Sequence, residues 1–196
     1  RQPNLNVPDP SYHGMVWTEF AKAVGPIAYI VRARFVGLRD LGPALSPTNA
    51  FQIIQGLETV TLRMEKHCSN AAKVAEYLSS HEKVSKVIYA GLDEGEAGVR
   101  ANKYLKGGHG ALCGFELKGG KPSGEKFINN LNMFYHVANI GDARSLAIHP
   151  ATTTHSQLSD EDMESAGVNP SYVRLSIGIE HIDDIIEDLK NALDAA

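Results

Sequence analysis

Apolar and polar residues alternate over residues 173–179, and this pattern predicts a β-strand with one apolar face. From residue 182 onward the apolar positions instead recur every three or four residues, which predicts an amphipathic helix that begins near His181. The apolar face of the predicted strand carries every second residue: Val173, Leu175, Ile177 and Ile179. A strand that runs directly into a helix is therefore the clearest structural unit of the sequence.

The longest helical pattern covers residues 47–80. Ser46 is a good N-cap, and Pro47 suits the first helical position because no hydrogen bond from its nitrogen is needed there. One uninterrupted helix of this length would extend roughly 50 Å at 1.5 Å per residue. Such a helix usually bridges two bodies, and Gly56 offers a position for a bend.

Shorter patterns fill the rest of the chain. Prolines predict an extended or looped start over residues 1–15, followed by short helices at 18–24 and 27–41. Beyond the long helix, further strands and helices alternate. The predicted strands cover 84–91, 111–117, 134–137 and 144–147, and the predicted helices cover 96–105 and 123–131. The fold class is therefore α+β, a small sheet with helices on one face.

Composition excludes several classes of protein. At 196 residues and 43% hydrophobic, the chain can bury an ordinary core. A formal net charge of −4 disfavours a nucleic-acid-binding surface, and no apolar run is long enough to span a membrane. Two cysteines, Cys68 and Cys113, do not suggest a disulfide framework, so we expect a reducing cytoplasm.

Arg174 lies on the polar face of the predicted strand and needs an anion if it is buried. A solvated arginine, a structural ion pair and a clamp for a substrate carboxylate all remain open, because a guanidinium matches a carboxylate with two parallel hydrogen bonds. The segment 138–159 is long, polar and irregular, as functional loops often are. Its hydroxyl, amide and backbone donors, together with Arg174, predict a site for an anionic group.

The same segment contains two histidines, His149 and His155. With Asp142 or Asp160 as a third ligand, they raise the alternative of a metal site. Their spacing matches no ligand pair of a helix or strand, so we expect no metal.

Six motifs resemble the Cys/Met metabolism family of pyridoxal-phosphate enzymes, in order and over essentially the whole chain. The resemblance implies the C-terminal small domain of a fold-type I transferase, with a small, mostly antiparallel sheet. Within the family, Asn139-Ile-Gly-Asp is most similar to the O-acetylhomoserine sulfhydrylase branch. The motifs are Leu45-Ser-Pro-Thr-Asn-Ala, Gly56-Leu-Glu-Thr, Leu62-Arg-Met-Glu-Lys-His, Gly141-Asp-Ala-Arg-Ser-Leu, His149-Pro-Ala-Thr-Thr-Thr-His and Val173-Arg-Leu-Ser-Ile-Gly-Ile-Glu.

The resemblance assigns substrate-binding roles to three residues. Arg174 matches the arginine that holds the α-carboxylate of the amino-acid substrate, and Thr154 matches a threonine in the same pocket. Asn139 stands where many relatives have serine, which departs from the γ-lyase pattern and favours the sulfhydrylase. The implied reaction, part of methionine and cysteine metabolism, joins O-acetylhomoserine to sulfide or a thiol and gives homocysteine or methionine and acetate. Cystathionine γ-synthase and methionine γ-lyase chemistry remain alternatives.

The resemblance also implies that the catalytic lysine lies upstream of this chain, in a Ser-x-Thr-Lys context that the sequence does not contain. Pyridoxal phosphate would then be bound mainly by a missing N-terminal half, and this chain alone would be inactive. We expect a fragment in three parts: the tail of the large domain (1–46), a connecting helix (47–80) and a C-terminal domain (81–196). The family is typically tetrameric. A non-catalytic domain that binds carboxylates or a partner protein remains the competing hypothesis.

Overall fold

A computed structural model describes residues 2–196, except for the side chain of Asp160. The chain forms two compact units, Arg1–Gly56 and Leu57–Ala196. The predicted division into three parts at residues 46 and 80 remains a prediction. No described helix is long and apolar enough to cross a membrane.

The first unit is a set of short helices around Trp17, whose side chain is fully buried. The Trp17 ring centroid lies 4.8 Å from that of Tyr12 and 5.9 Å from that of Phe35. Its indole nitrogen donates to a carboxylate oxygen of Asp9 at 3.0 Å. The helices are α1 (Pro3–Asn6), the 3-10 helix η1 (Pro10–Tyr12), α2 (Trp17–Ala21), α3 (Ala28–Arg32) and the π-helix η2 (Ala33–Asp40).

The prediction that prolines keep residues 1–15 free of helix is wrong. Pro3 and Pro10 each occupy the first position of a short helix. A proline is tolerated there because the N–H that it lacks would have no partner within the helix. The predicted helix over 27–41 is confirmed as helical backbone, although its second part is a π-helix.

The long helical pattern forms two helices, α4 (Pro47–Glu58) and α5 (Val60–Ser80), rather than one. The break lies at Thr59, with φ −114° and ψ 8°, and not at Gly56. Three β-branched residues in succession, residues 59–61, lower the helical propensity at this point. The predicted cap of α4 is confirmed, because Ser46 Oγ accepts from the Asn49 N–H at 3.1 Å.

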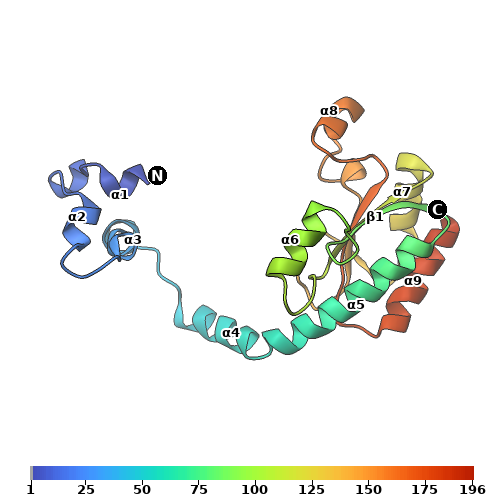
Figure 1. Cartoon of the computed structure of the whole chain (residues 1–196), viewed down its shortest axis with the longest axis horizontal. Helices are drawn as coiled ribbons and strands as arrows, with labels where there is room; N and C mark the ends of the chain where they lie inside the picture. Colours follow the sequence, from blue (N-terminus) through green and yellow to red (C-terminus); the bar gives the residue numbers. More distant parts are fainter. Residues whose placement is uncertain (1) are drawn as a thin grey trace. The chain divides into compact units, whose positions relative to one another are not determined.

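The second unit, in which Figure 1 shows strands and helices packed together, contains a five-stranded sheet in the order β1-β2-β5-β4-β3. All neighbouring strands are antiparallel except β3 and β4, which are parallel, so the mostly antiparallel sheet is confirmed. The strands are β1 (Val84–Ile88), β2 (Leu112–Leu117), β3 (Tyr135–His136), β4 (Leu146–Ile148) and β5 (Tyr172–Ser176).

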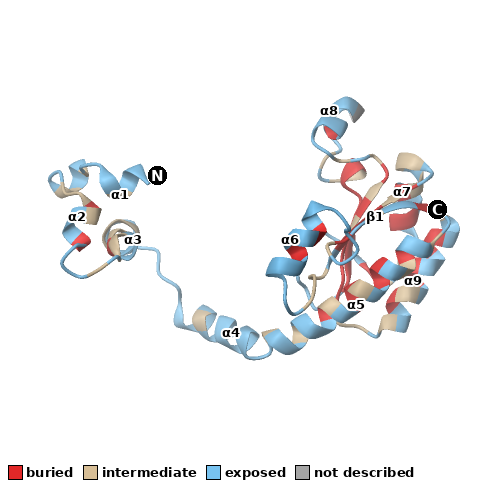
Figure 2. Ribbon diagram, in the orientation of Figure 1, coloured by how far each residue is buried: buried red, intermediate tan, exposed pale blue. Residues whose placement is uncertain are grey.

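Helices α5, α7 (Gly120–Asn129) and α9 (Ile182–Ala195) cover one face of this sheet, and the buried core lies between them and the strands (Figure 2). Alternate residues of β2 and β5 point into this core, as the period-2 pattern predicts. They are Cys113, Phe115 and Leu117 on β2, and Val173 and Leu175 on β5, with Ile177 beyond its end. Arg174 therefore lies on the opposite face.

Three further helices complete the second unit: α6 (Glu96–Tyr104), the 3-10 helix η3 (Pro150–Thr152) and α8 (Asp160–Ser165). The predicted helix start after β5 is confirmed, because the His181 side chain accepts from the Asp183 N–H at the beginning of α9. Strand β4, which lies within the polar segment 138–159, pairs directly with β5, and Ile148 of β4 is opposite Arg174. This topology brings the polar segment predicted from the sequence beside Arg174.

Candidate functional site

The centre of the candidate site is Arg174, in the middle strand of the sheet. Its cross-strand neighbours are Gly114 on β2 and Ile148 on β4. Gly114 leaves the space on this face open, and the ring of Tyr172 fills it so closely that a Cβ at position 114 would have no room. Arg174 is thereby flanked by an aromatic ring and an aliphatic side chain.

The Arg174 guanidinium is only partly used by the protein. One Nη2–H donates to the backbone carbonyl of Asn139 across 3.4 Å, which is a long hydrogen bond. Its Nε is buried and has no hydrogen-bond partner. The ion pairs among the described residues do not include Arg174. A buried guanidinium N–H without an acceptor is energetically unfavourable, so the Arg174 guanidinium is poised to bind an anion.

The structure brings Asn139 to Arg174, but through its backbone oxygen rather than through its side chain. Thr154 lines a shallow hollow with Ala138, which precedes Asn139, and with Ile148, which pairs with Arg174. Its hydroxyl lies 2.9 Å from Nδ1 of His155. Among the described contacts none joins Thr154 directly to Arg174. The three predicted residues thus surround one region of the sheet face, with a direct contact only between two of them.

Tyr172 is a candidate site residue that the sequence reasoning missed. Burial raises the pKa of its phenol, and the nearby positive charge of Arg174 opposes that shift. The hydroxyl therefore remains protonated at neutral pH and can donate a hydrogen bond. A signal was present in the sequence, because Tyr172 directly precedes the predicted strand and lies two residues from Arg174, so an extended backbone places both on one face.

The sequence reasoning also missed a group of polar residues next to the loop that carries Asn139. Glu180, Ser145 and Gly178 are joined by hydrogen bonds across 33 to 35 residues of sequence. Two buried polar residues of α5, His67 and Asn70, bond the backbone just after β5. The only sequence signal was that these two positions adjoin the apolar stripe of α5, where a polar side chain needs a buried partner.

His149 is held by hydrogen bonds inside the fold. It is fully buried. Its Nε2 lies 2.8 Å from the carbonyl oxygen of Pro170, and its Nδ1 lies 3.0 Å from the Thr152 hydroxyl. Because a carbonyl only accepts, Nε2 carries the proton and Nδ1 accepts from the hydroxyl. Among the described residues, no group of three or more His, Cys, Asp or Glu could hold a metal ion, and the side chain of Asp160 lies outside them.

We expect His149 to make the stability of the chain depend on pH. Burial lowers the pKa of its imidazole in the folded state below the ordinary value of 6.5. As the pH falls below that value the unfolded state takes up a proton first, so the free energy of unfolding decreases until the folded-state pKa is passed. The change His149→Gln, which keeps a donor for the Pro170 carbonyl, should weaken this decrease between pH 7.5 and 5.5 in urea titrations.

The control for this experiment is His155→Gln, a less buried histidine of the same segment. It should keep the pH dependence of the unchanged chain. If the free energy of unfolding falls equally with pH in the unchanged chain and in His149→Gln, His149 does not have this role. Only the pH dependence of the free energy of unfolding is compared, because either substitution also alters packing and therefore the absolute stability.

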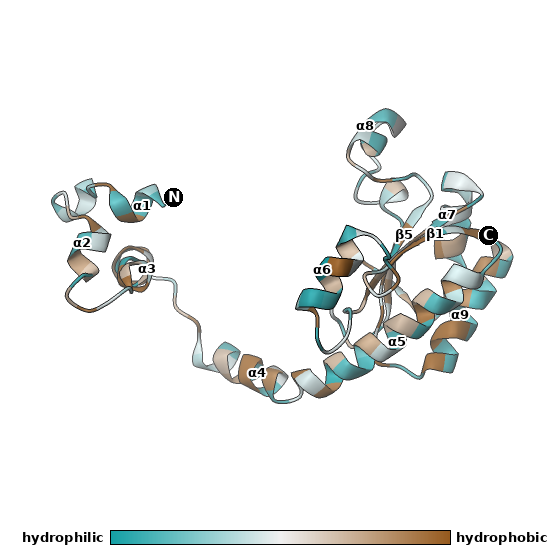
Figure 3. Ribbon diagram, viewed as in Figure 1, coloured by the Kyte–Doolittle hydropathy of each residue, from teal (hydrophilic) through white to brown (hydrophobic). Residues whose placement is uncertain are grey.

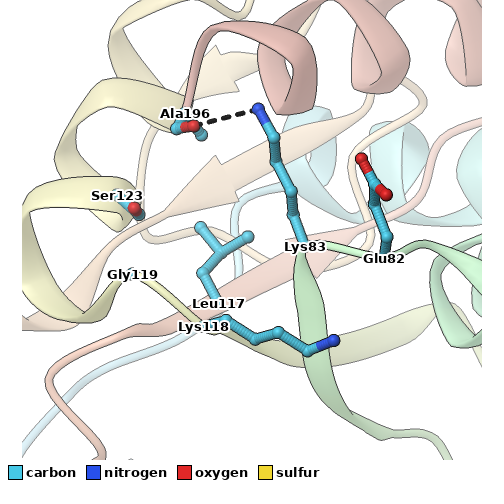
Figure 4. A pocket seen from close by; sticks show the side chains of 7 residues that line it. All are labelled: Glu82, Lys83, Leu117, Lys118, Gly119, Ser123 and Ala196. Carbon is cyan, nitrogen blue, oxygen red and sulfur yellow. Dashed lines mark hydrogen bonds between the residues drawn. The ribbon is translucent and has the colours of Figure 1, made fainter.

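A separate hollow, which none of the candidate site residues lines, lies beside the start of β1, the end of β2 and the end of α9 (Figure 4). Lys83 points into it, but the Lys83 ammonium already donates to the carbonyl oxygens of Leu193, Asp194 and Ala196 at 2.8, 3.0 and 3.1 Å. A lysine at this position donates hydrogen bonds to the last carbonyl groups of α9. Its positive charge also interacts favourably with the negative end of the helix dipole. The Lys83 ammonium is therefore not free to bind a carboxylate.

Comparisons with known proteins show what this chain is similar to. The model of the family described as "Cys/Met metabolism PLP-dependent enzyme" matches residues 13–194. The chain is 54% identical to the O-acetyl-L-homoserine sulfhydrylase of Leptospira meyeri, over 97% of this chain and 44% of that protein. It is 47% identical to the homocysteine synthase of Schizosaccharomyces pombe, over 100% of this chain and 45% of that protein.

A solved structure is similar over the same range. It is a putative O-acetylhomoserine (thiol)-lyase from Campylobacter jejuni that carries N'-pyridoxyl-lysine-5'-monophosphate. It matches 98% of this chain and 45% of its own, with a TM-score of 0.83 and 42% identity. The chain thus spans just under half the length of the relatives that it matches. With a family match over nearly all its residues, the chain belongs to the Cys/Met metabolism family of pyridoxal-phosphate-dependent enzymes.

Proposed function

We propose that this chain is the C-terminal, substrate-side part of an enzyme that replaces the γ-substituent of O-acetylhomoserine. Sulfide or a thiol would enter, acetate would leave, and the product would be homocysteine or methionine. The names of the two curated relatives above support this reaction. Since the chain spans under half of their length, the activity belongs to a longer protein, which we call the full-length protein.

The observation that carries the proposal is the buried, unpartnered Nε of Arg174. A bidentate carboxylate uses Nε and one Nη of a guanidinium, and here Nη2 has only a long bond to Asn139. The α-carboxylate of the amino-acid substrate would complete this pair of hydrogen bonds. Fixing the carboxylate orients the Cα–H bond of the substrate, which supplies part of the rate enhancement.

Asn139 and Thr154 would complete the carboxylate pocket. Asn139 holds the guanidinium through its backbone carbonyl, and its exposed side-chain amide would be available to the substrate. Thr154 is exposed on the rim of the hollow beside Ala138 and Ile148 and offers a hydroxyl donor. These roles rest on the match to the family motifs and on the placement of both residues around Arg174.

Pyridoxal phosphate, when bound, supplies an electron sink for the carbanion that forms on the substrate. The residues of this chain do not build a covalent site for it. All lysines are described, and all are exposed except Lys83 and Lys121, which are half-buried. Lys83 is held by three carbonyl groups at the end of α9. We therefore assign the cofactor lysine to the upstream part and expect this chain alone to be inactive.

Exposed apolar residues on α4 support an upstream partner within the same protein (Figure 3). Phe51, Ile53, Ile54 and Leu57 are each more than half exposed, which is unusual for four apolar residues on one short helix. We propose that the N-terminal half covers them in the full-length protein, and that four copies then assemble. Two free cysteines, Cys68 and Cys113, suit a cytoplasmic location.

The test compares this chain with the full-length protein. Both receive pyridoxal phosphate, O-acetylhomoserine and sulfide, and homocysteine is measured by mass spectrometry while bound cofactor is followed by its absorbance. We expect homocysteine only from the full-length protein, at a rate at least a thousandfold above that of the cofactor alone. A full-length protein that binds no cofactor would instead favour a non-catalytic carboxylate-binding domain. Turnover by this chain alone would contradict the assignment of the lysine.

A further inference from the structure

The loop that carries Asn139 is fastened to the end of β5 by its own backbone. The Gly141 N–H donates to the Ser176 hydroxyl at 3.1 Å. Two residues further on, the Ala143 carbonyl accepts from the Ile179 N–H at 2.9 Å. Residues 139–145 therefore lie against residues 176–180, immediately beyond the strand that holds Arg174.

Glu180 closes this contact with both oxygens of its carboxylate. Oε1 accepts from the Ser145 N–H at 2.6 Å, and Oε2 accepts from the Ser145 hydroxyl at 3.0 Å. The same hydroxyl accepts from the Gly178 N–H at 2.9 Å. Ser145 is fully buried, and a Cβ at Gly178 would collide with Glu180 and with the backbone of residues 143–144. The arrangement leaves room for a glycine only.

Helix α5 holds the other side of the same turn. The Asn70 amide donates to the carbonyl oxygens of Gly178 at 3.0 Å and of Glu180 at 2.9 Å. Nδ1 of His67, which is buried, lies 2.6 Å from the Ile177 carbonyl oxygen. The backbone of Glu180 is thus fixed from the helix, and its carboxylate fixes the loop.

We propose that Glu180 is a positioning residue for the carboxylate clamp, acting through the loop 139–145. This inference rests on the proposed function. The ion pairs of the described residues do not include Glu180, so its carboxylate is committed to Ser145. Only one residue separates Gly141 from Asn139, whose carbonyl aims the Arg174 guanidinium. If the loop were free to move, the Asn139 carbonyl would no longer orient the Arg174 guanidinium.

The experiment compares Glu180→Ala, Glu180→Gln and the control Glu187→Gln, an exposed glutamate on α9. Backbone amide exchange of Ser145 and Gly178 is measured in this chain, and KM and kcat for O-acetylhomoserine are measured in the full-length protein. Glu180→Ala should speed the exchange at least tenfold and raise KM about tenfold, with kcat within about twofold, because ground-state carboxylate binding is lost.

Glu180→Gln separates positioning from a loss of folding. Its amide oxygen still accepts from the Ser145 N–H, but its amide nitrogen cannot accept from the hydroxyl. Its KM should lie between those of the unchanged protein and Glu180→Ala, and Glu187→Gln should change neither KM nor exchange. If Glu180→Ala does not fold, the Gln variant alone decides the question. Any rise in KM that is matched by an equal fall in kcat would argue for general damage.

Two outcomes would overturn the proposal. Unchanged exchange at Ser145 in both Glu180 variants would mean that the carboxylate does not hold the loop. Faster exchange with an unchanged KM would mean that the loop does not position the clamp. A full-length protein with no activity would refute the proposed function but leave the exchange result intact, so the two failures are distinguishable.

Discussion

Replacing Arg174 by alanine in the full-length protein should raise the KM for O-acetylhomoserine by roughly a hundredfold or more. The loss of one partner from a hydrogen-bonded charge pair costs about 2–5 kcal/mol. The guanidinium is poised for such a pair, with a buried Nε that has no partner and an Nη2 that has only a 3.4 Å bond. Steady-state kinetics over a wide range of substrate concentration measure the effect.

The lysine variant distinguishes charge from geometry. Arg174→Lys keeps the positive charge but loses the planar pair of donors, so its KM should still be about tenfold higher than that of the unchanged protein. Arg100→Ala serves as the control, because Arg100 is an exposed residue of α6 whose ion pair with Glu96 spans 3.8 Å. Surface pairs of this kind contribute little, and the kinetics should not change.

A substrate analogue tests which group Arg174 holds. Changing the α-carboxylate of O-acetylhomoserine to an amide should weaken binding to the unchanged protein and have little further effect on Arg174→Ala. This double-mutant logic isolates the contact between the two groups. An unchanged KM in Arg174→Ala, or equal losses with the amide in both proteins, would remove Arg174 from the substrate site.

Sequence patterns were sufficient where a single element decides the structure. The alternation around Arg174 placed it correctly on the face of β5 opposite the core, because the period of a strand leaves no other choice. The helix after His181 was equally well determined. The cap at Ser46 was recognisable because its partner lies three residues away.

Patterns failed where distant segments meet. In the sequence, Glu180 is recognisable only as an acidic residue just before a helix. In the structure its carboxylate accepts hydrogen bonds from Ser145, 35 residues away. Asn70 lies 108 and 110 residues from the carbonyl groups that it bonds. Neither partner can be deduced without the fold. The break at Thr59 was not predicted for a different reason. An apolar stripe continues through Thr59 and masks a local weakness in helix propensity.

The stability of the second unit should depend most on the contacts around Phe115. Its side chain is fully buried on β2, which lies between β1 and β5. The ring meets that of Phe127 on α7 edge to face, with centroids 5.2 Å apart and planes at 82°. It therefore joins the sheet to the helical layer, and no neighbouring side chain is free to fill its place in a close-packed core.

Replacing Phe115 by alanine should lower the free energy of unfolding by about 3–5 kcal/mol, through lost burial and the cavity that remains. Urea unfolding of this chain, followed by far-UV circular dichroism, measures the change. Fluorescence would not serve, because the single tryptophan, Trp17, belongs to the other unit. Phe115→Leu fills most of the volume and should cost about 1–2 kcal/mol.

Leu112→Ala is the matched control, on the same strand but on the opposite face and 41% exposed. It should cost less than about 1 kcal/mol, because little apolar surface returns to water. The dependence of the free energy on urea should be similar in all variants if only stability changes. A loss for Phe115→Ala no greater than that for Leu112→Ala would mean that the α5, α7 and α9 layer does not pack on this face of the sheet, and the core described for this unit would be wrong.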